Sequence, residues 1–331
     1  ATALRCQTGD LTIDGIFQRR AWAGELGTFD WLPDGRSFGA LESTDQGATD
    51  LYRVDAVTGE RQLLVRGADL VPAGARAPVA IEEYTFSPDR SKLLLFTNSQ
   101  RVWRQNTKGV YYVWDLTAKK LTPVSTKPGY QMFAKFSPDG RLVGFVRDNN
   151  LFVTDLANGR ERQLTQDGSE HVINGTTDWV YEEELDLRDA FRFSPDGRRI
   201  AFWRFDQTEI PPFYLLDELS LYPELIPVRY PKAGTANSQV RLGVVDLQTG
   251  TTRWIEPGGG PDRYVARMDY AGSPDSIWFI RLNRGQNRLE LLLADVNTGR
   301  SRVIMTDADS AWVDVHEPIW LGGGRQFLYL S

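Results

Sequence analysis

Short apolar runs recur along this chain and alternate with residues that favour turns. Runs such as LLLF at 93–96 and IAFW at 200–203 are too short for helices and are typical of buried β-strands. A common phrase, Ser-Pro-Asp-Gly or a close variant, recurs beside such runs. It occupies residues 32–36, 87–90, 137–141 and 194–198 and, more weakly, 273–275. Proline fixes φ at the second turn position and glycine suits the fourth, so we expect a type I turn in each.

A second phrase alternates with the first and consists of a strand, an aspartate and a turn that most often contains glycine. It occupies residues 52–59, 112–116, 152–159, 244–250 and 293–299. Each phrase joins two strands, so the two phrases together encode four antiparallel strands, which is one blade of a β-propeller. The prolines of the first phrase lie 55, 50, 57 and 79 residues apart, whereas a blade needs only about 40 to 45. Insertions must therefore interrupt the blades.

We expect an all-β fold, a β-propeller of four-stranded antiparallel blades, of which this chain forms roughly the first five to six. A β-sandwich also has short strands and frequent turns, but it would not repeat one turn phrase in register with a second. Residues 319–331 read as a further turn-and-strand unit that stops inside a blade. Such a unit leaves strand edges unpaired. We therefore expect one propeller domain over residues 1–331, incomplete at its C-terminal end, in a polypeptide that continues.

Two of the insertions are interpreted from their residue types. Residues 98–110 lie between two hairpins of one blade and read as a solvated basic loop with Arg101 and Arg104. Residues 206–239 carry five prolines and the apolar string FYLL at 213–216. A segment of this length is usually functional or disordered, and its apolar content argues against disorder. We expect another subunit or a neighbouring domain to cover it.

The third insertion, residues 168–189, carries a run of acids. Asp178 can cap a short helix that starts at Trp179, which places three glutamates, 182–184, in its early turns. The run is either a plain helix start, whose carboxylates complement the helix dipole, or a seat for a cation inside a cavity. Residue types alone leave both interpretations open. Residues 174–176, Asn-Gly-Thr, also form a glycosylation sequon.

Composition and charge argue against several classes of function. The net charge of −6 argues against a nucleic-acid surface, and 41% hydrophobic with 25% charged residues is typical of a globular protein. No apolar run approaches the roughly 18 residues needed to span a bilayer. Cys6 is the only cysteine, so no internal disulfide can form. We expect no metal and no cofactor.

The acidic run TDWVYEEE at 177–184 stands among other distinctive phrases. In sequence order these are LTIDGIF at 11–17, WR at 103–104 with YYVWDL at 111–116, FDQTEIP at 205–211 and VRYPKAG at 228–234. Together they resemble the dipeptidyl peptidase IV family of serine exopeptidases, from about residue 11 to about residue 331. The eight-residue acidic motif is the most specific of them.

The resemblance implies a propeller of eight blades followed by an α/β-hydrolase domain with a Ser-Asp-His triad. It implies that Glu183 and Glu184 hold the α-ammonium group of a peptide substrate with a free N-terminus. It also implies that Arg104 contacts the carbonyl of the substrate's first residue, and that residues 208–232 form an arm used in homodimerisation. Neither nucleic acid nor a membrane is an expected partner. Residues 314–317 depart from the family's pattern and receive no role.

The chain has no nucleophile of the expected kind. No Gly-x-Ser-x-Gly elbow occurs, and His171 and His316 have no serine partner by motif. We expect the α/β-hydrolase domain to be absent from this chain and the chain alone to be inactive. The parent protein is expected to release X-Pro or X-Ala dipeptides and to be periplasmic or secreted, with a cytoplasmic location as the alternative. A propeller that binds a peptide or protein without catalysis is the alternative function. A tripeptidyl-releasing or acylaminoacyl relative is a third option, which Glu183, Glu184 and Arg104 disfavour.

Overall fold

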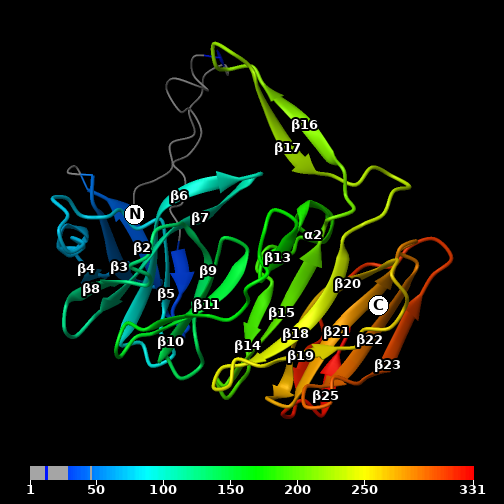
Figure 1. Cartoon of the computed structure of the whole chain (residues 1–331). Coiled ribbons are helices and arrows are strands. Elements are labelled where there is room, and N and C mark those ends of the chain that lie inside the picture. The colour runs from blue at the N-terminus through cyan, green and yellow to red at the C-terminus, as the bar shows by residue number, and fades with distance from the viewer. Residues whose placement is uncertain (1–11, 14–28, 45–46) are drawn as a thin grey trace. The chain divides into compact units, whose positions relative to one another are not determined.

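The structure is a computed structural model that describes residues 12–13, 29–44 and 47–331. The chain divides into two compact units, residues 1–83 and 84–331, whose elements are labelled in Figure 1. Cys6 and most of the expected lead-in at 11–17 lie outside the described residues.

Antiparallel sheets, with strands taken in sequence order, make up nearly all of the described chain (Figure 1). The first unit contains β1 (Phe29–Trp31), β2 (Ser37–Ser43), β3 (Thr49–Asp55), β4 (Arg61–Val65) and the 3-10 helix η1 (Gly67–Asp69). The next two blades contain β5 (Glu83–Phe86), β6 (Lys92–Val102), β7 (Gln105–Asp115), β8 (Lys120–Pro123), β9 (Gln131–Phe136), β10 (Leu142–Arg147), β11 (Asn150–Asp155) and β12 (Glu161–Gln163).

The later blades carry the helix and the long insertion. Their elements are β13 (Val172–Asn174), α2 (Trp179–Leu185), β14 (Phe191–Phe193), β15 (Arg199–Asp206), β16 (Pro212–Asp217), β17 (Glu224–Arg229), β18 (Gln239–Asp246), β19 (Thr252–Ile255), β20 (Arg263–Ser273), β21 (Ser276–Asn283), β22 (Arg288–Asp295), β23 (Ser301–Ala308), β24 (Ile319–Leu321) and β25 (Gln326–Leu328). Five four-stranded units and the first hairpin of a sixth are therefore present in the described residues. The predicted β-propeller is confirmed.

One side-chain arrangement closes the first hairpin of three consecutive blades. In each blade a serine hydroxyl donates to the aspartate two residues later at 2.6 Å and accepts the amide five residues later at 2.9 Å. The serines are Ser87, Ser137 and Ser194. The fourth turn residue has a positive φ, 68° at Gly140 and 59° at Arg90. The weaker phrase differs, because Asp275 pairs with Arg199 at 2.9 Å instead.

The aspartate of the second phrase fixes the other hairpin turn. Asp246 accepts the amides of Gln248 at 2.9 Å and Thr249 at 2.8 Å through Oδ1, and Gly250 follows with a φ of 75°. Asp55 and three further aspartates make the same pair of bonds or one of them. Each predicted turn therefore carries its own local side-chain brace.

The insertion at 98–110 is largely exposed, as expected, but it is a continuation of two strands rather than a loop. β6 and β7 continue through it and turn at Trp103, whose φ is 52°. The ladder survives there because two register shifts absorb the irregular residues. Near its start β7 also pairs with β9 through Lys108 and Gly109, which joins two blades into one eight-stranded sheet. Arg104 therefore lies at the tip of a long hairpin rather than in a loop.

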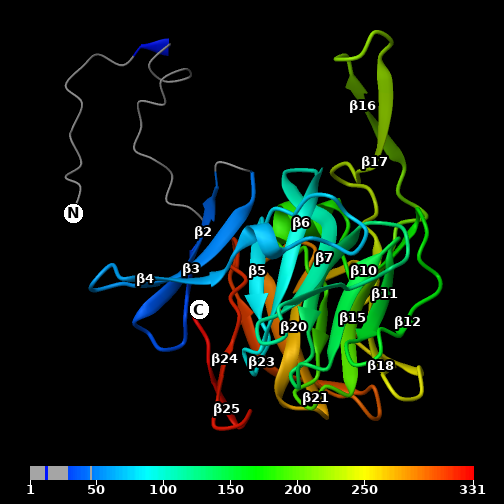
Figure 2. The same cartoon turned by 90° about the vertical axis from the view of Figure 1, so that its left-hand side faces the viewer.

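The insertion at 206–239 is the two-stranded arm β16–β17, which projects from the blades (Figures 1 and 2). β15 ends at Asp206 and β18 begins at Gln239, so its predicted limits agree with the structure. Many of its apolar side chains are exposed in the single chain, among them Tyr214, Leu216, Leu219, Leu221, Tyr222 and Leu225. The arm therefore presents apolar surface that its own chain leaves open.

The largest buried core cluster joins the blade of β15 to the blade of β20–β23. Trp203, Phe205 and Phe279 are fully buried in it, and Tyr181 and Leu185 of α2 belong to the same cluster. Burial of aromatic side chains on this scale is the main source of stability for such a domain. The helix is therefore set into the core between two blades rather than attached to their surface.

The serine brace yields a stability prediction. Ser137→Ala removes the acceptor of the Leu142 amide at a buried position, so the free energy of unfolding should fall by about 1–3 kcal/mol. The control is Ser273→Ala, whose hydroxyl accepts only the Asp275 amide at 3.2 Å in an exposed turn. Urea unfolding followed by tryptophan fluorescence measures both. Equal losses would show that the brace does not stabilise the hairpin.

Candidate functional site

The acidic helix lies in an excursion that interrupts the first strand of one blade. β13 and β14 both pair antiparallel with β15, on either side of Trp203, and residues 175–190 leave the sheet between them. The backbone of Trp203 closes the neck of this excursion. Its C=O accepts the Gly175 N–H at 3.1 Å, and its N–H donates to the Ala190 C=O at 3.0 Å. Both ends of the excursion are therefore fixed to one buried residue.

Glycine is required where the excursion begins. Gly175 has a φ of 78°, and a Cβ there would lie 2.6 Å from Leu151 Cδ2 and 2.9 Å from Val146 Cγ2. Only glycine fits both the backbone and the space. The preceding Asn174 is 1% exposed, and its side-chain amide donates to Asp167 at 2.9 Å. The sequon at 174–176 is therefore not an accessible glycosylation site.

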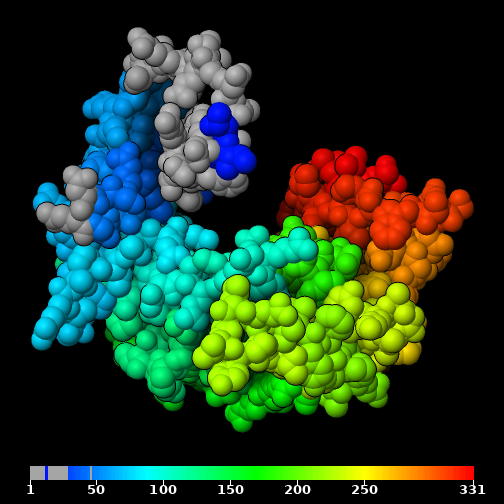
Figure 3. Space-filling model, turned by 90° about the horizontal axis from the view of Figure 1, so that it is seen from above, coloured from blue at the N-terminus to red at the C-terminus, as the bar shows by residue number. Residues whose placement is uncertain are grey.

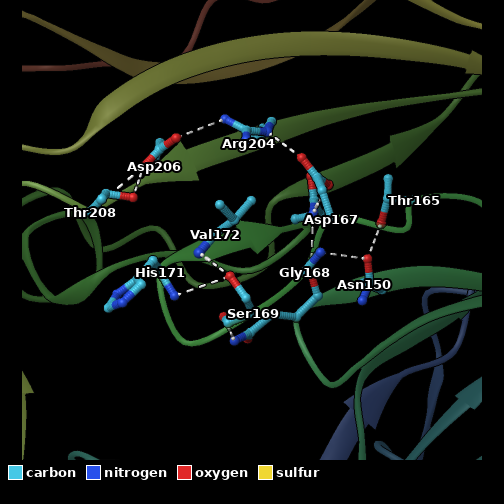
Figure 4. A network of polar contacts seen from close by, with 12 residues as sticks. Asn150, Thr165, Asp167, Gly168, Ser169, His171, Val172, Arg204, Asp206 and Thr208 are labelled. Carbon is cyan, nitrogen blue, oxygen red and sulfur yellow. Dashed lines mark hydrogen bonds and ion pairs between the residues drawn. The ribbon is translucent and has the colours of Figure 1, made fainter.

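The loop that leads into β13 is held by a polar network (Figure 4). The Asn150 side-chain oxygen accepts the Gly168 N–H and the Thr165 hydroxyl, both at 3.0 Å. Arg204 Nε donates to Asp167 Oδ2 at 2.7 Å. Because Arg204 belongs to β15, the loop is tied to the same strand that holds the excursion. The loop before β13 is thus held in place against β15 and the start of β11.

Capping residues mark both ends of α2. The predicted N-cap is confirmed, since the Asp178 carboxylate accepts the Tyr181 N–H at 3.0 Å. The same carboxylate accepts the Ser238 hydroxyl at 2.5 Å. Burial raises the pKa of Asp178 above its ordinary value. The helix ends at Leu185, and its C-cap residue Asp186 adopts the left-handed conformation with a φ of 49°.

The three glutamates of α2 occupy three different environments, because successive helical residues point about 100° apart. Glu182 is buried and its Oε1 lies 3.4 Å from Arg188 Nε. Burial raises the pKa of Glu182. The Glu183 side chain is 14% exposed, and its Oε2 lies 3.0 Å from Arg104 Nε. Glu184 is exposed. The run therefore divides into a buried glutamate that faces Arg188, a second that pairs with Arg104, and an exposed third.

The Arg104–Glu183 ion pair joins the tip of the β6–β7 hairpin to α2, where the cyan and green surfaces meet in Figure 3. The Arg104 side chain is 76% exposed, so the pair contributes at most about 1 kcal/mol. A cavity of about 280 Å³ lies beside it, lined by Trp103, Glu182 and Trp179 among others. The structure thus brings Arg104 and Glu183 together, with Glu184 as an exposed neighbour.

The exit of the excursion is tied to the preceding blade. Lys135 of β9 forms an ion pair with Asp189 and donates to the Phe191 C=O at 2.9 Å. Burial lowers the pKa of Lys135 to about 8, although Asp189 opposes the shift. The lysine therefore carries its charge below about pH 8 and loses it above, and the ion pair goes with it.

Several residues that shape the site gave no signal in the sequence. Arg188 neutralises Glu182, and Ser238 and Lys135 hold the two ends of the excursion from 60 and 54 residues away. Of the contacts that hold the acidic helix, only the N-cap could be predicted from the sequence, because its partners are close together in the chain. Neither His171 nor His316 lines the cavity beside the Arg104–Glu183 pair.

Bilayer-spanning helices and metal-binding clusters are both absent from the described residues. None of the helices within 12–13, 29–44 and 47–331 is both long enough and apolar enough to cross a bilayer. In those same ranges, three or more His, Cys, Asp or Glu side chains nowhere gather in a way that could hold a metal ion. The acidic run at 182–184 does not form such a group.

Fold and site together define a β-propeller whose insertions are joined by an ion pair between a hairpin tip and a short acidic helix. Residues 87–331 match the family model for the dipeptidyl peptidase IV N-terminal region. The protein named "Probable dipeptidyl peptidase 4" from Aspergillus fumigatus is 31% identical in an alignment of length 317 that covers 92% of this chain and 40% of that protein. Dipeptidyl aminopeptidase B from Saccharomyces cerevisiae is 28% identical, over 90% of this chain and 37% of its own length.

A solved structure agrees with these relatives. The crystal structure of Porphyromonas gingivalis dipeptidyl peptidase 4 has a TM-score of 0.83 and 29% identity, covering 93% of this chain and 44% of that one. The chain belongs to the dipeptidyl peptidase IV family and corresponds to its N-terminal region. It spans about two fifths of the length of the curated relatives that it matches.

The start of the excursion gives a second prediction. Gly175→Ala should lower the free energy of unfolding by about 2 kcal/mol more than Gly159→Ala. Both glycines have positive φ values, 78° and 70°, but a Cβ at Gly159 meets no atom within 4 Å. The comparison therefore isolates the clash with Leu151 and Val146. Thermal and urea unfolding of the two variants measure the difference, and equal losses would contradict the steric account.

Proposed function

We propose that this chain is the substrate-gating and N-terminus-anchoring propeller of a dipeptidyl peptidase IV-like serine exopeptidase. The parent enzyme releases N-terminal dipeptides of the X-Pro or X-Ala type from peptides. The observation that carries the proposal is the 3.0 Å pairing of Glu183, on a helix fixed in the core, with Arg104 on the facing hairpin. Catalysis belongs to an α/β-hydrolase domain of the parent protein, and the peptide reaches that domain with its N-terminus held by the propeller.

The proposed roles follow from charge. The Glu183 and Glu184 carboxylates accept hydrogen bonds from the substrate α-ammonium, each worth about 1.5–3 kcal/mol. Arg104 donates to the carbonyl oxygen of the first substrate residue, for which its planar guanidinium is suited. A peptide with an acylated N-terminus leaves both carboxylates without a cation, and this penalty creates the specificity for free N-termini.

The existing ion pair prepares the site for this exchange. The Glu183 side chain is already largely buried opposite Arg104, so little further burial is needed when an ammonium arrives. Because the pair contributes at most about 1 kcal/mol, Arg104 can turn toward the substrate carbonyl at little cost. Fixing the ammonium then sets the distance to the scissile bond two residues further on.

The arm β16–β17 is the proposed dimer contact. Its apolar side chains are exposed on the single chain, and Leu219 at its tip is 98% exposed. Its base reaches the site, because Tyr230 packs edge-on against Trp179 at 4.4 Å between ring centroids. Apolar surface of this extent on a projecting hairpin is typical of a protein interface.

The anchoring roles predict the effect of charge removal in the full-length enzyme. Glu183→Gln and Glu184→Gln should each lower kcat/KM for dipeptidyl substrates by about 10-fold or more, because each removes one charge-assisted contact. Steady-state kinetics with a Gly-Pro chromogenic amide measure this loss. Binding should also weaken above about pH 8, where the α-amino group of the substrate loses its charge.

Glu182→Gln is the control for the two substitutions. Its carboxylate faces Arg188 rather than Arg104, so kcat/KM should change least. An equal loss in all three variants, or no loss in any, would assign the acidic run to helix formation alone and remove the anchoring function.

The arm predicts a change in assembly. Replacing Leu219, Leu221 and Tyr222 with serine in the full-length protein should shift dimer toward monomer, since the exposed tip loses its apolar surface. The control is Val57→Ser, an exposed apolar residue in a blade turn, which should leave the dimer unchanged. Sedimentation velocity across a concentration series distinguishes the two, and an unchanged dimer in both would exclude the arm from the interface.

A further inference from the structure

α2 is too short to be stable as an isolated helix. It has seven residues, whereas isolated helices shorter than about 12 residues are marginal in water. Its place must come from contacts with the rest of the chain. Asp178 and Ser238 fix its N-terminal end at 2.5 Å. The C-terminal end, where Glu184 lies, needs a different support.

β20, the first strand of the next blade, supplies that support at two points. The Val265 N–H donates to the Tyr181 hydroxyl oxygen at 2.9 Å, and Arg267 Nη1 donates to the Leu185 C=O at 2.6 Å. The pairing of β20 with β21 shifts register between Val265 and Arg267, which marks a β-bulge at Ala266. A bulge redirects the side chains beside it. Both donors thereby meet the same helix one turn apart.

The Arg267 guanidinium has three partners, because Nη1 donates to the Leu185 C=O and, at 2.8 Å, to the Ala266 C=O of its own strand, and Nε pairs with Glu317. Nη1 reaches the last carbonyl of α2, where backbone acceptors lack intrahelical donors and a cation is favourable. Nε pairs with Glu317 Oε1 at 3.1 Å, and the side chain is only 17% exposed. Glu317 thus holds the guanidinium in the orientation that reaches the helix. A lysine ammonium lacks this forked geometry.

We infer that Arg267 is a positioning residue for N-terminus recognition, which it serves by fixing the end of α2 that carries Glu184. This inference rests on the proposed function. Leu185 directly follows Glu184, so a shift of the Leu185 carbonyl displaces that carboxylate first. Glu183 keeps a second support, its ion pair with Arg104. Arg267 itself touches no substrate.

The test uses the full-length enzyme and the Gly-Pro chromogenic amide. Arg267→Met should raise KM about five-fold or more with kcat within about two-fold, because ground-state and transition-state binding of the ammonium weaken together. Arg267→Lys keeps the charge but not the fork, so it should recover only part of the loss. It also supplies the comparison if Arg267→Met lowers Tm too far for kinetics.

Double variants identify the residue through which Arg267 acts. In a Glu184→Gln background Arg267→Met should add little, whereas in a Glu183→Gln background its effect should be nearly additive. Additive losses in both backgrounds would overturn the inference, because they would mean that Arg267 does not act through Glu184.

Arg199→Met is the matched control for general loosening of the blades. Arg199 Nη1 donates to the Pro274 C=O at 3.0 Å and pairs with Asp275 at 2.9 Å, so it joins the same two blades with the same chemistry at another place. It should leave KM within about two-fold. An equal rise of KM in Arg199→Met, or a change of Tm alone in Arg267→Met, overturns the positioning role. If Glu183→Gln and Glu184→Gln prove silent, the proposed function fails and the inference fails with it.

Discussion

Trp203 holds the blade and the candidate site together through three hydrogen bonds. Its backbone C=O and N–H bond to the two ends of the excursion 175–190, and its indole N–H donates to the Val265 C=O at 2.8 Å. The residue is fully buried, so none of these groups has water as an alternative partner. This closure fixes the two ends of the segment that carries α2.

The two halves of the candidate site differ in how firmly they are packed. α2 is set into the core through Tyr181 and Leu185, whereas Arg104 lies mostly exposed at the tip of a hairpin. A rigid acceptor facing a movable donor suits a ligand that presents an ammonium and a carbonyl together. In the proposed function, the carboxylate on α2 sets the position of the ammonium, and Arg104 turns to the carbonyl. Rigid elements give this positional precision better than loops do.

The sequence predicted those features of the structure that depend on interactions between residues close together in the chain. The repeated turns and the Asp178 cap were readable because each depends on residues within a few positions of one another. The extension of the β6–β7 hairpin was missed. The residues of 98–110 are mostly polar and show no strand pattern, although strand pairing continues there through two register shifts. The split strand was also missed. β13 and β14 have three residues each, too few for any periodicity to show.

The contacts that fix α2 come from much later in the chain, which bears on synthesis. Each blade pairs strands that are neighbours in sequence, so it can form soon after it leaves the ribosome. The partners of α2 lie 60 residues further on at Ser238, 84 at Val265 and 82 at Arg267. At about 5–20 residues per second, translation takes roughly 4–17 seconds to supply them. During that interval the acidic segment has left the ribosome without its supports, and its buried residues are open to chaperones until the next blade docks.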